Sequence, residues 1–188
     1  MTTNPQRRGA AVDARVLEAT LALLAERGAA LTVDEVAAAS GVHKTTIYRR
    51  YATREQLIAA AVMSLAEQAV PPIADDDPRA AIERLALAVA ATTRSDSGPN
   101  ILRATIAASA ASSELVQLAD AFFRARYALA VEHLRRLAES GGLRPGVDPV
   151  VVWEQIVNPM HVRALCGRPT TDEDARVLVE LALRGAAA

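Results

Sequence analysis

The apolar positions of this chain repeat mostly at the spacing of α-helices. In the first segment, spacings of three and four predict a helix over about residues 9–27, with a buried face formed by Val12, Val16, Ala19 and Leu23. Gly28 follows Arg27 and is a typical C-terminal stop. No segment alternates convincingly with a period of two, so the pattern predicts an all-α fold without a sheet.

Two capping signals organise the next part of the chain. Thr32 is followed three positions later by Glu35, and Thr53 is followed by Gln56. This is the pattern of a capping box, in which two side chains satisfy backbone N–H groups at the start of a helix. Ser40-Gly41 interrupts the helix that the first box begins. We therefore expect short helices over 32–39 and 43–51, and a longer one over 53–69.

Proline and glycine mark the remaining boundaries. Pro71-Pro72 interrupts the helical pattern, and Gly141-Gly142 ends it again later. Pro78 and Pro149 each stand where a first-turn proline is favoured. Five further helices are expected, over 78–94, 100–108, 113–139, 148–165 and 172–184, which makes about nine in the chain.

The segment SGVHKTTIYRRYATREQL, residues 40–57, concentrates polar, cationic and aromatic side chains. Two short helices joined by a tight glycine-containing turn are typical of a helix-turn-helix. Gly41 suits that turn because glycine adopts positive φ without a steric cost. In such motifs the start of the second helix enters the major groove of DNA. The face predicted to meet DNA carries His43, Lys44, Thr45, Thr46, Tyr48 and Arg49.

These side chains suit different parts of DNA. Thr45 and Thr46 can reach base edges or a thymine methyl group, whereas Lys44 and Tyr48 have the reach for phosphates, and Arg49 for either. The helix that begins at Thr53 would direct its N–H groups and Arg54 towards a phosphate, as Thr32 would at the earlier helix. The alternative is an ordinary amphipathic helical pair with a solvated charged face.

Composition and charge narrow the class of protein. Hydrophobic residues make up 51% and charged residues 23%, which is typical of a globular chain. The net charge is −1, but residues 1–55 carry +2 (eight basic, six acidic) and residues 56–188 carry −3 (thirteen basic, sixteen acidic). No apolar run approaches the roughly 20 residues that span a bilayer, and no signal peptide is found. We expect a cytoplasmic protein without a membrane partner.

The segment LTVDEVAAASGVHKTTIYRRYATREQLIAAAV resembles the DNA-binding half of TetR-family transcriptional repressors. The similarity covers residues 9–69. The matching positions are Thr32, Val36-Ala37, Gly41-Val42, Ile47-Tyr48, Tyr51 and Glu55-Gln56-Leu57.

This resemblance implies an all-α homodimer that binds palindromic double-stranded operator DNA. A three-helix helix-turn-helix head, residues 1–52, would continue into a larger helical body for effector binding and dimerisation, residues 53–188. Many relatives have glycine or a small residue where Thr45 stands, and a lysine near Arg54. The implied operator contacts are Thr32, His43, Lys44, Thr45, Thr46, Tyr48 and Arg49, with Thr53 and Arg54 on phosphates.

The C-terminal region is similar to an actinobacterial-type subgroup of the same family. The similarity lies in GGLRPGVDPVVVWEQIVNPMHVRALCGRPTTDEDARVLVELAL. It implies that the helices over 148–165 and 172–184 pair with their two-fold copies in a four-helix bundle. The residues expected to pack there are Val152, Ile156, Val177, Leu178, Leu181 and Leu183.

The body should hold a site for a small-molecule effector between its helices. Along the helix expected over 113–139, Arg126 and His133 interrupt a stripe that also holds Leu118, Phe122 and Leu129. Arg126 could instead reach solvent, and His133 could be an ordinary core histidine. A lining poor in polar groups suits an apolar or amphipathic ligand. The candidate ligand-binding residues are Arg103, Phe122, Arg126, His133, Trp153, Asn158 and His161.

Catalytic signatures are absent from the sequence. His43, His133, His161 and Cys166 have no metal-ligand spacing, and neither GxSxG nor a phosphate-binding glycine loop is found. We expect no enzyme activity, no catalytic residue, no metal and no cofactor. The function predicted is a sequence-specific DNA-binding transcriptional regulator, a homodimeric repressor that its effector releases from the operator. The alternative is a helical small-molecule-binding module without DNA-binding output.

Overall fold

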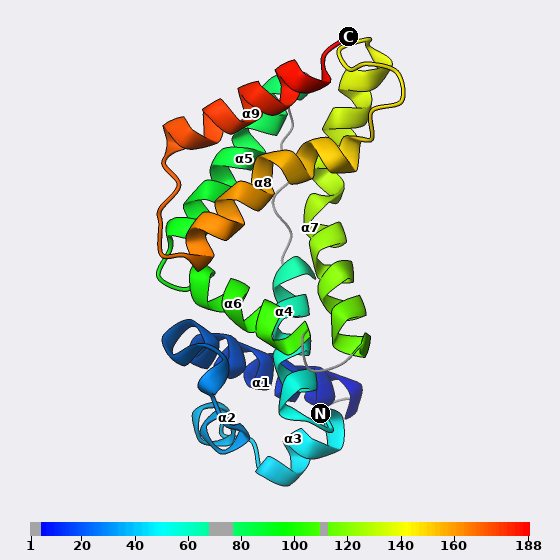
Figure 1. Ribbon diagram of the computed structural model, residues 1–188. Helices are drawn as coiled ribbons and strands as arrows, with labels where there is room; N and C mark the ends of the chain where they lie inside the picture. Colours follow the sequence, from blue (N-terminus) through cyan, green and yellow to red (C-terminus); the bar gives the residue numbers. More distant parts are fainter. Residues whose placement is uncertain (1–4, 68–76, 110–112) are drawn as a thin grey trace. The chain divides into compact units, whose positions relative to one another are not determined.

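The computed structural model describes residues 5–67, 77–109 and 113–188, and these residues form helices and loops only (Figure 1). The predicted all-α class is confirmed. The helices are α1 (Pro5–Arg27), α2 (Val33–Ser40), α3 (Lys44–Arg50), α4 (Arg54–Glu67), α5 (Pro78–Arg94), α6 (Gly98–Ser109), α7 (Ser113–Glu139), α8 (Pro149–Leu165) and α9 (Asp172–Ala186), with a short 3₁₀ turn, η1 (Gly28–Ala30), after α1.

Two helices begin earlier than the sequence predicts. The helix α1 starts at Pro5 rather than near residue 9, and α6 starts at Gly98 rather than Asn100. In α6 the Gly98 N–H donates to Ser95 Oγ at 3.0 Å, so part of the expected loop is a helix cap. The expected end of the fourth helix near residue 69, the Pro71-Pro72 break and the residues just before α7 lie outside the described residues.

Side-chain caps fix the ends of several helices. At α2 the capping box predicted from Thr32 and Glu35 is present. At α4 the Gln56 N–H donates to Thr53 Oγ1 at 3.1 Å, but Gln56 Oε1 accepts from the Ala52 N–H at 3.1 Å, one residue earlier than a standard box requires. The starts of α2 and α4 therefore follow local hydrogen bonds that the sequence encodes.

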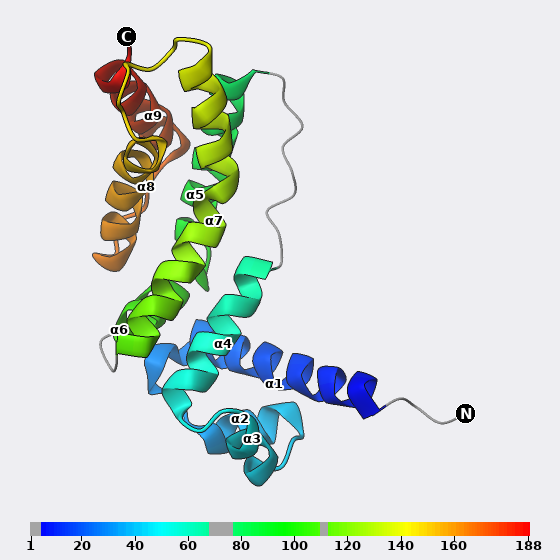
Figure 2. The same ribbon diagram turned by 90° about the vertical axis from the view of Figure 1, so that its right-hand side faces the viewer.

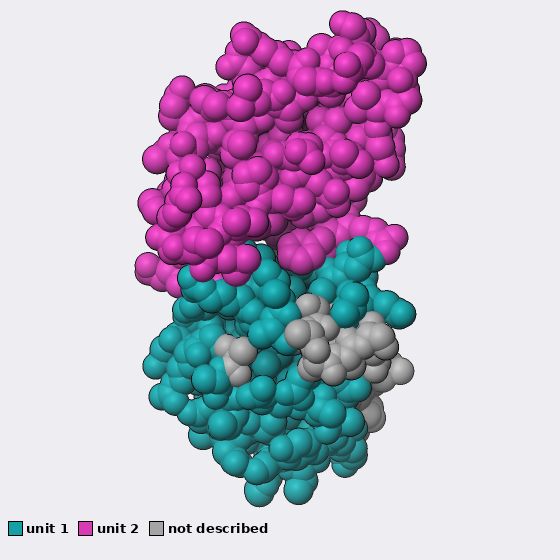
Figure 3. Space-filling view, in the orientation of Figure 1, with its two compact units in different colours: residues 1–68, 100–122 teal, residues 69–99, 123–188 magenta. Residues whose placement is uncertain are grey.

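The chain divides into two compact units, coloured separately in Figure 3. Unit 1 contains residues 1–68 and 100–122, and unit 2 contains residues 69–99 and 123–188. The predicted division after residue 52 separates roles in function, and it stays a prediction.

In unit 1, the core joins the helices of the predicted head to α4. Leu24 of α1, Val36 of α2, Ile47 of α3 and Leu57 of α4 are almost fully buried in one cluster. The helix α1 packs against both α2 and α4. Because Ile47 is the buried residue of α3, this one contact fixes which side of α3 faces solvent.

In unit 2, α8 and α9 lie side by side and both pack against α5 (Figures 1 and 2). Ile82 of α5, Leu134 of α7 and Trp153 of α8 are central members of the buried cluster. Val152, Ile156 and Leu183 belong to the same cluster, although the sequence placed them in a bundle with a second subunit. That placement is wrong for these three, because they fill the core of their own subunit.

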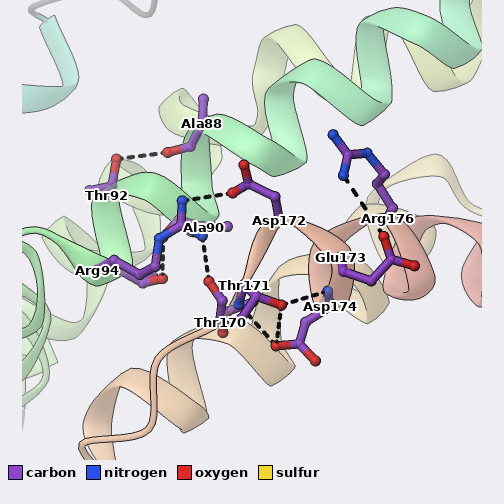
Figure 4. Close-up of polar contacts among 11 residues, drawn as sticks. Ala88, Ala90, Thr92, Arg94, Thr170, Thr171, Asp172, Glu173, Asp174 and Arg176 are labelled. Carbon is purple, nitrogen blue, oxygen red and sulfur yellow. Dashed lines mark hydrogen bonds and ion pairs between the residues drawn. The ribbon is translucent and has the colours of Figure 1, made fainter.

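Two arginines hold the turn between α8 and α9. Arg94, at the end of α5, donates to the Thr170 carbonyl at 2.5 Å and to the Asp172 carboxylate at 2.7 Å (Figure 4). Arg163 donates to Asp174 at 3.1 Å, and Asp174 in turn forms a capping box with Thr171. Farther along α9, Arg176 pairs with Glu83 of α5 at 3.0 Å. These bonds fix how α8 and α9 pack against α5.

Candidate nucleic-acid interface and ligand site

A glycine turn sets the relation between α2 and α3. Gly41 has φ of 65°, the left-handed conformation that a side chain resists. The Val42 N–H donates to Ser40 Oγ at 3.3 Å, and Val42 itself is buried. Together with the buried Ile47, this geometry defines a helix-turn-helix with one side of α3 free.

The solvent side of α3 carries the side chains that the sequence assigned to DNA. Tyr48 keeps 44% of its surface exposed, which is high for an aromatic residue. Thr46 is half-buried beside the core. His43, Lys44, Thr45 and Arg49 are exposed as well.

Lys44 is paired with an acidic residue of the preceding helix. Its Nζ lies 2.8 Å from the Asp34 carboxylate and 5.9 Å from the centre of the Tyr48 ring. The hydrogen bond that Lys44 donates to Asp34 raises the pKa of Lys44 above its usual value. Lys44 is therefore charged and exposed, and Asp34 is an acceptor that DNA phosphates would have to replace.

Arg50, the next residue after Arg49, faces the other way. Its guanidinium donates to both Asp13 carboxylate oxygens at 2.5 Å, and the Tyr51 hydroxyl lies 3.5 Å from the same carboxylate. Burial raises the pKa of Tyr51, and the Asp13 charge adds to that effect. Arg50 therefore ties α3 to α1 through Asp13.

The predicted phosphate contacts lie at the starts of α2 and α4. Thr32 and Thr53 are exposed, and both use their hydroxyls as helix caps. Arg54 is half-buried, with its guanidinium 3.1 Å from Glu55 and 3.5 Å from the Leu31 carbonyl. The hydrogen bonds of Arg54 hold the start of α4 beside the end of η1.

A group of aromatic rings joins α7 to α8 in unit 2. The Phe123 ring centre lies 6.0 Å from that of Tyr127 and 5.8 Å from that of His161, and the Tyr127 ring meets Trp153 edge-on at 6.5 Å. Burial and the Glu154 charge raise the pKa of Tyr127 to about 12. We name these four rings the aromatic cluster.

Charge near the aromatic cluster comes from Arg126 on α7. Burial lowers the pKa of Arg126. Burial also lowers the pKa of His161, and Arg126 adds to this effect, so the imidazole is neutral at neutral pH. Arg126, Trp153 and His161, three of the predicted ligand-binding residues, therefore lie in one region.

The other predicted ligand-binding residues lie elsewhere. Arg103 is exposed in unit 1, where it donates to the Asn100 side chain at 3.2 Å, and Phe122 packs against the core of unit 1. Asn158 is exposed on α8. His133 is buried in unit 2, and neither of its ring nitrogens has a hydrogen-bond partner.

Sequence reasoning missed Phe123 and Tyr127. Both belong to the aromatic cluster, and they stand four residues apart on the same helix. In a chain with 3% aromatic residues, two aromatics at that spacing form one face of a helix and could have indicated the site.

A groove crosses the outer surface of α8 and α9. Its volume is about 490 Å³, and its lining includes Val151, Pro159, Leu178 and Leu181. Val151 and Leu181 keep 49% and 63% of their surfaces exposed. Val162 of α8 and Val177 of α9 are also exposed apolar residues. Within the described part of unit 2, this face holds apolar surface that the subunit does not cover.

The fold and the helix-turn-helix define a class of helical DNA-binding regulators, and two family profiles identify it more closely. "Bacterial regulatory proteins, tetR family" matches residues 16–61, and "Tetracyclin repressor-like, C-terminal domain" matches residues 72–182. The chain belongs to the TetR family of DNA-binding transcriptional regulators.

Solved structures agree with this assignment. The TetR family transcription regulator SCO0332 is 31% identical, with a TM-score of 0.69 over 94% of this chain and 99% of that one. A TetR transcriptional regulator from Agrobacterium tumefaciens is 22% identical, with a TM-score of 0.74 over 94% of each chain. FadR from Bacillus subtilis, in complex with stearoyl-CoA, is 14% identical, with a TM-score of 0.73 over 92% of this chain and 98% of that one. No curated protein sequence matches.

Two further properties concern the described residues alone. None of their helices has both the length and the apolar character needed to cross a bilayer. They also contain no group of three or more His, Cys, Asp or Glu side chains placed to hold a metal ion.

Proposed function

We propose that this protein is a homodimeric repressor that binds a palindromic operator and leaves it when a small-molecule effector binds. The head, residues 1–52, would read DNA, and the body, residues 53–188, would bind the effector and dimerise. The orientation of α3 carries the proposal most directly, because the buried Ile47 leaves Lys44 and Tyr48 exposed on the opposite side.

The proposed DNA contacts divide into base-reading and phosphate-binding groups. Thr45 and Thr46 would read base edges near the start of α3, because that end of the helix enters the major groove in this motif. Since Arg54 is engaged with Glu55 and Leu31, it would have to reorganise to reach a phosphate. The complete proposed set is Thr32, His43, Lys44, Thr45, Thr46, Tyr48, Arg49, Thr53 and Arg54.

The proposed dimer uses the outer face of α8 and α9. Leu181 and Val151 are large apolar residues that a two-fold copy would remove from water. Two heads are also needed to contact two half-sites about 34 Å apart on one side of DNA. The bundle face thus consists of the exposed residues of α8 and α9, and the buried Val152, Ile156 and Leu183 support it from within.

The proposed effector site lies in the body, around Arg126, Trp153 and His161. Effector binding would favour a conformation of the dimer with lower operator affinity, as linkage requires of two coupled sites. The complex of FadR with stearoyl-CoA supports an apolar or amphipathic ligand, since that protein has the same fold. The remaining candidates are Arg103, Phe122, His133 and Asn158.

Selection of bound duplexes from a random pool tests the DNA-binding part. The purified protein should enrich an inverted repeat, and its affinity for that repeat should fall steeply with salt because phosphate contacts release counterions. Tyr48→Ala should reduce this binding and leave the dimer intact. Retention of no duplex over competitor DNA at moderate salt would contradict the proposal and favour a helical small-molecule-binding module without DNA-binding output.

A further inference from the structure

Arg126 is a cation that the described protein leaves without a partner. Its guanidinium is partly withdrawn from water, and burial alone accounts for its lowered pKa. No acceptor within hydrogen-bond or ion-pair distance is found for it among the described residues. A guanidinium stays protonated in proteins, so burying it unpaired costs free energy that a bound anion would offset.

Two members of the aromatic cluster are also hydrogen-bond donors. Trp153 is 2% exposed, and its Nε1–H has no acceptor in the structure. The neutral His161 imidazole can donate one N–H. Among charged side chains, Arg126 is the one that perturbs His161, and both residues lie in unit 2. The aromatic cluster therefore has a cation acting on it, Arg126, and a buried donor without an acceptor, the Trp153 N–H.

The carboxylate of Glu154 acts on Tyr127 rather than on Arg126. The Glu154 charge contributes to the raised pKa of Tyr127, but it has no resolved effect on Arg126. The aromatic cluster otherwise offers apolar ring surface, with Phe123 5.8 Å from His161 and 6.0 Å from Tyr127 between ring centres. The apolar part of a ligand would pack on these rings, and its negatively charged group would bind Arg126.

We infer that this region binds an organic anion, with its negative group on Arg126 and its apolar body on the aromatic cluster. The N–H groups of Trp153 and His161 are further donors for polar groups of the ligand. A carboxylate is the simplest group with the required charge and two acceptor oxygens. A regulatory role for this anion rests on the proposed function, in which this region binds the effector. The effector would then be an organic anion.

Trp153 is the single tryptophan of the chain, so tryptophan fluorescence reports on this site without DNA. The first probe set is octanoate, octanol and octylamine, which share one apolar chain and differ in charge. The second set is hydrocinnamate with the corresponding alcohol and amine, which share an aromatic ring. Each probe is titrated into the full-length protein at about neutral pH, up to about 1 mM. In at least one set, the acid should bind about tenfold or more tightly than its alcohol and amine, because a charge-assisted hydrogen bond is lost in both.

Variants of Arg126 separate charge recognition from folding. Arg126→Gln should abolish the preference for the acid, and Arg126→Lys should keep part of it. Arg135→Gln is the matched control, because Arg135 is an exposed arginine of the same helix, paired with Glu132 at 3.3 Å. Melting curves of all variants show whether they fold, and a preference retained in Arg126→Lys supports the inference even where Arg126→Gln is unstable.

Three results would overturn the inference. They are the absence of a fluorescence response to either acid, equal affinity for acid and alcohol in both sets, and a preference that survives in a folded Arg126→Gln variant. None of these measurements involves DNA. A protein that binds the acids but no operator would refute the proposed regulatory function and leave the anion site in place.

Discussion

The Nζ of Lys44 and the carboxylate of Asp34 lie 2.8 Å apart on the face proposed to meet DNA. The pair joins the first turn of α2 to the first residue of α3. An acidic side chain in this position both occupies the lysine and repels phosphates. Asp34 would thus lower the affinity for DNA of any sequence. Contacts to bases would then contribute a larger share of the binding free energy at the operator.

Removing the Asp34 charge should strengthen DNA binding. Asp34→Asn should raise the affinity for operator and for competitor duplexes by about two- to tenfold at low salt, because Lys44 is released and a repulsive charge is lost. Fluorescence anisotropy at two salt concentrations measures both. Glu26→Gln removes an exposed acidic charge from α1 and should have a smaller effect. Equal affinities for wild type and Asp34→Asn would show that the pair does not compete with DNA.

Arg49 and Arg50 are neighbours with different expected roles. Arg49→Ala should weaken operator binding and reduce the salt dependence by about one charge, because one phosphate or base contact is lost. Arg50→Ala should instead lower the free energy of unfolding by about 1 kcal/mol, since Asp13 loses its ion-pair partner. The salt dependence of DNA binding should stay unchanged in the folded fraction. Fluorescence anisotropy measures DNA binding and urea denaturation measures stability, so together they distinguish the effects of the two substitutions. Interchanged effects would mean that α3 meets DNA with its other side.

A charge on the outer face of α9 should disrupt the dimer. Leu181→Glu would bury a carboxylate in the proposed bundle, and should raise the dimer dissociation constant at least about tenfold. Val116→Glu places the same charge at a valine of α7 that is 51% exposed, and should leave the dimer intact. Sedimentation equilibrium measures both variants. A stable Leu181→Glu dimer would assign the interface to another surface.

The protein should lose stability below about pH 6.5. Burial lowers the pKa of His161 and of His133, with Arg126 adding to the effect at His161 and Arg136 at His133. As pH falls through the usual value of 6.5, the unfolded chain takes up protons that the folded protein excludes, so the free energy of unfolding falls by at most about 1.4 kcal/mol per pH unit for each histidine.

Urea denaturation between about pH 7.5 and pH 5.5 checks this expectation. His133→Gln and His161→Gln should each reduce the slope of stability against pH, whatever they do to stability at neutral pH. A pH dependence that is unchanged in both variants would mean that these histidines titrate normally in the folded protein.

Local signals in the sequence were sufficient for the helices and the turn. Thr32 with Glu35 marks the start of α2, and Gly41 marks its end, because caps and positive φ depend on neighbours within a few residues. The same reasoning placed the exposed side of α3, since Ile47 is the apolar residue of a short polar helix.

Contacts between distant residues could not be predicted in this way. The helices α8 and α9 are apolar on more than one side, so periodicity did not show that Ile156 and Leu183 face inward whereas Leu181 faces solvent. The pairing of Arg50 with Asp13 likewise joins residues 37 positions apart. Only the tertiary fold of unit 1, in which α1 packs against α2 and α2 against α3, brings that pair together.

Three residue types occur once each in this chain, and each lies in a different part of the proposed machinery. The only lysine is Lys44 on α3, the only tryptophan is Trp153 beside the aromatic cluster, and the only cysteine is the exposed Cys166 at the end of α8. Without mutagenesis, Lys44 can therefore carry an isotope-labelled methyl group and Cys166 a spin label, and the fluorescence of Trp153 can be recorded directly. DNA contact, ligand occupancy and subunit separation can thus be followed without changing the amino-acid sequence.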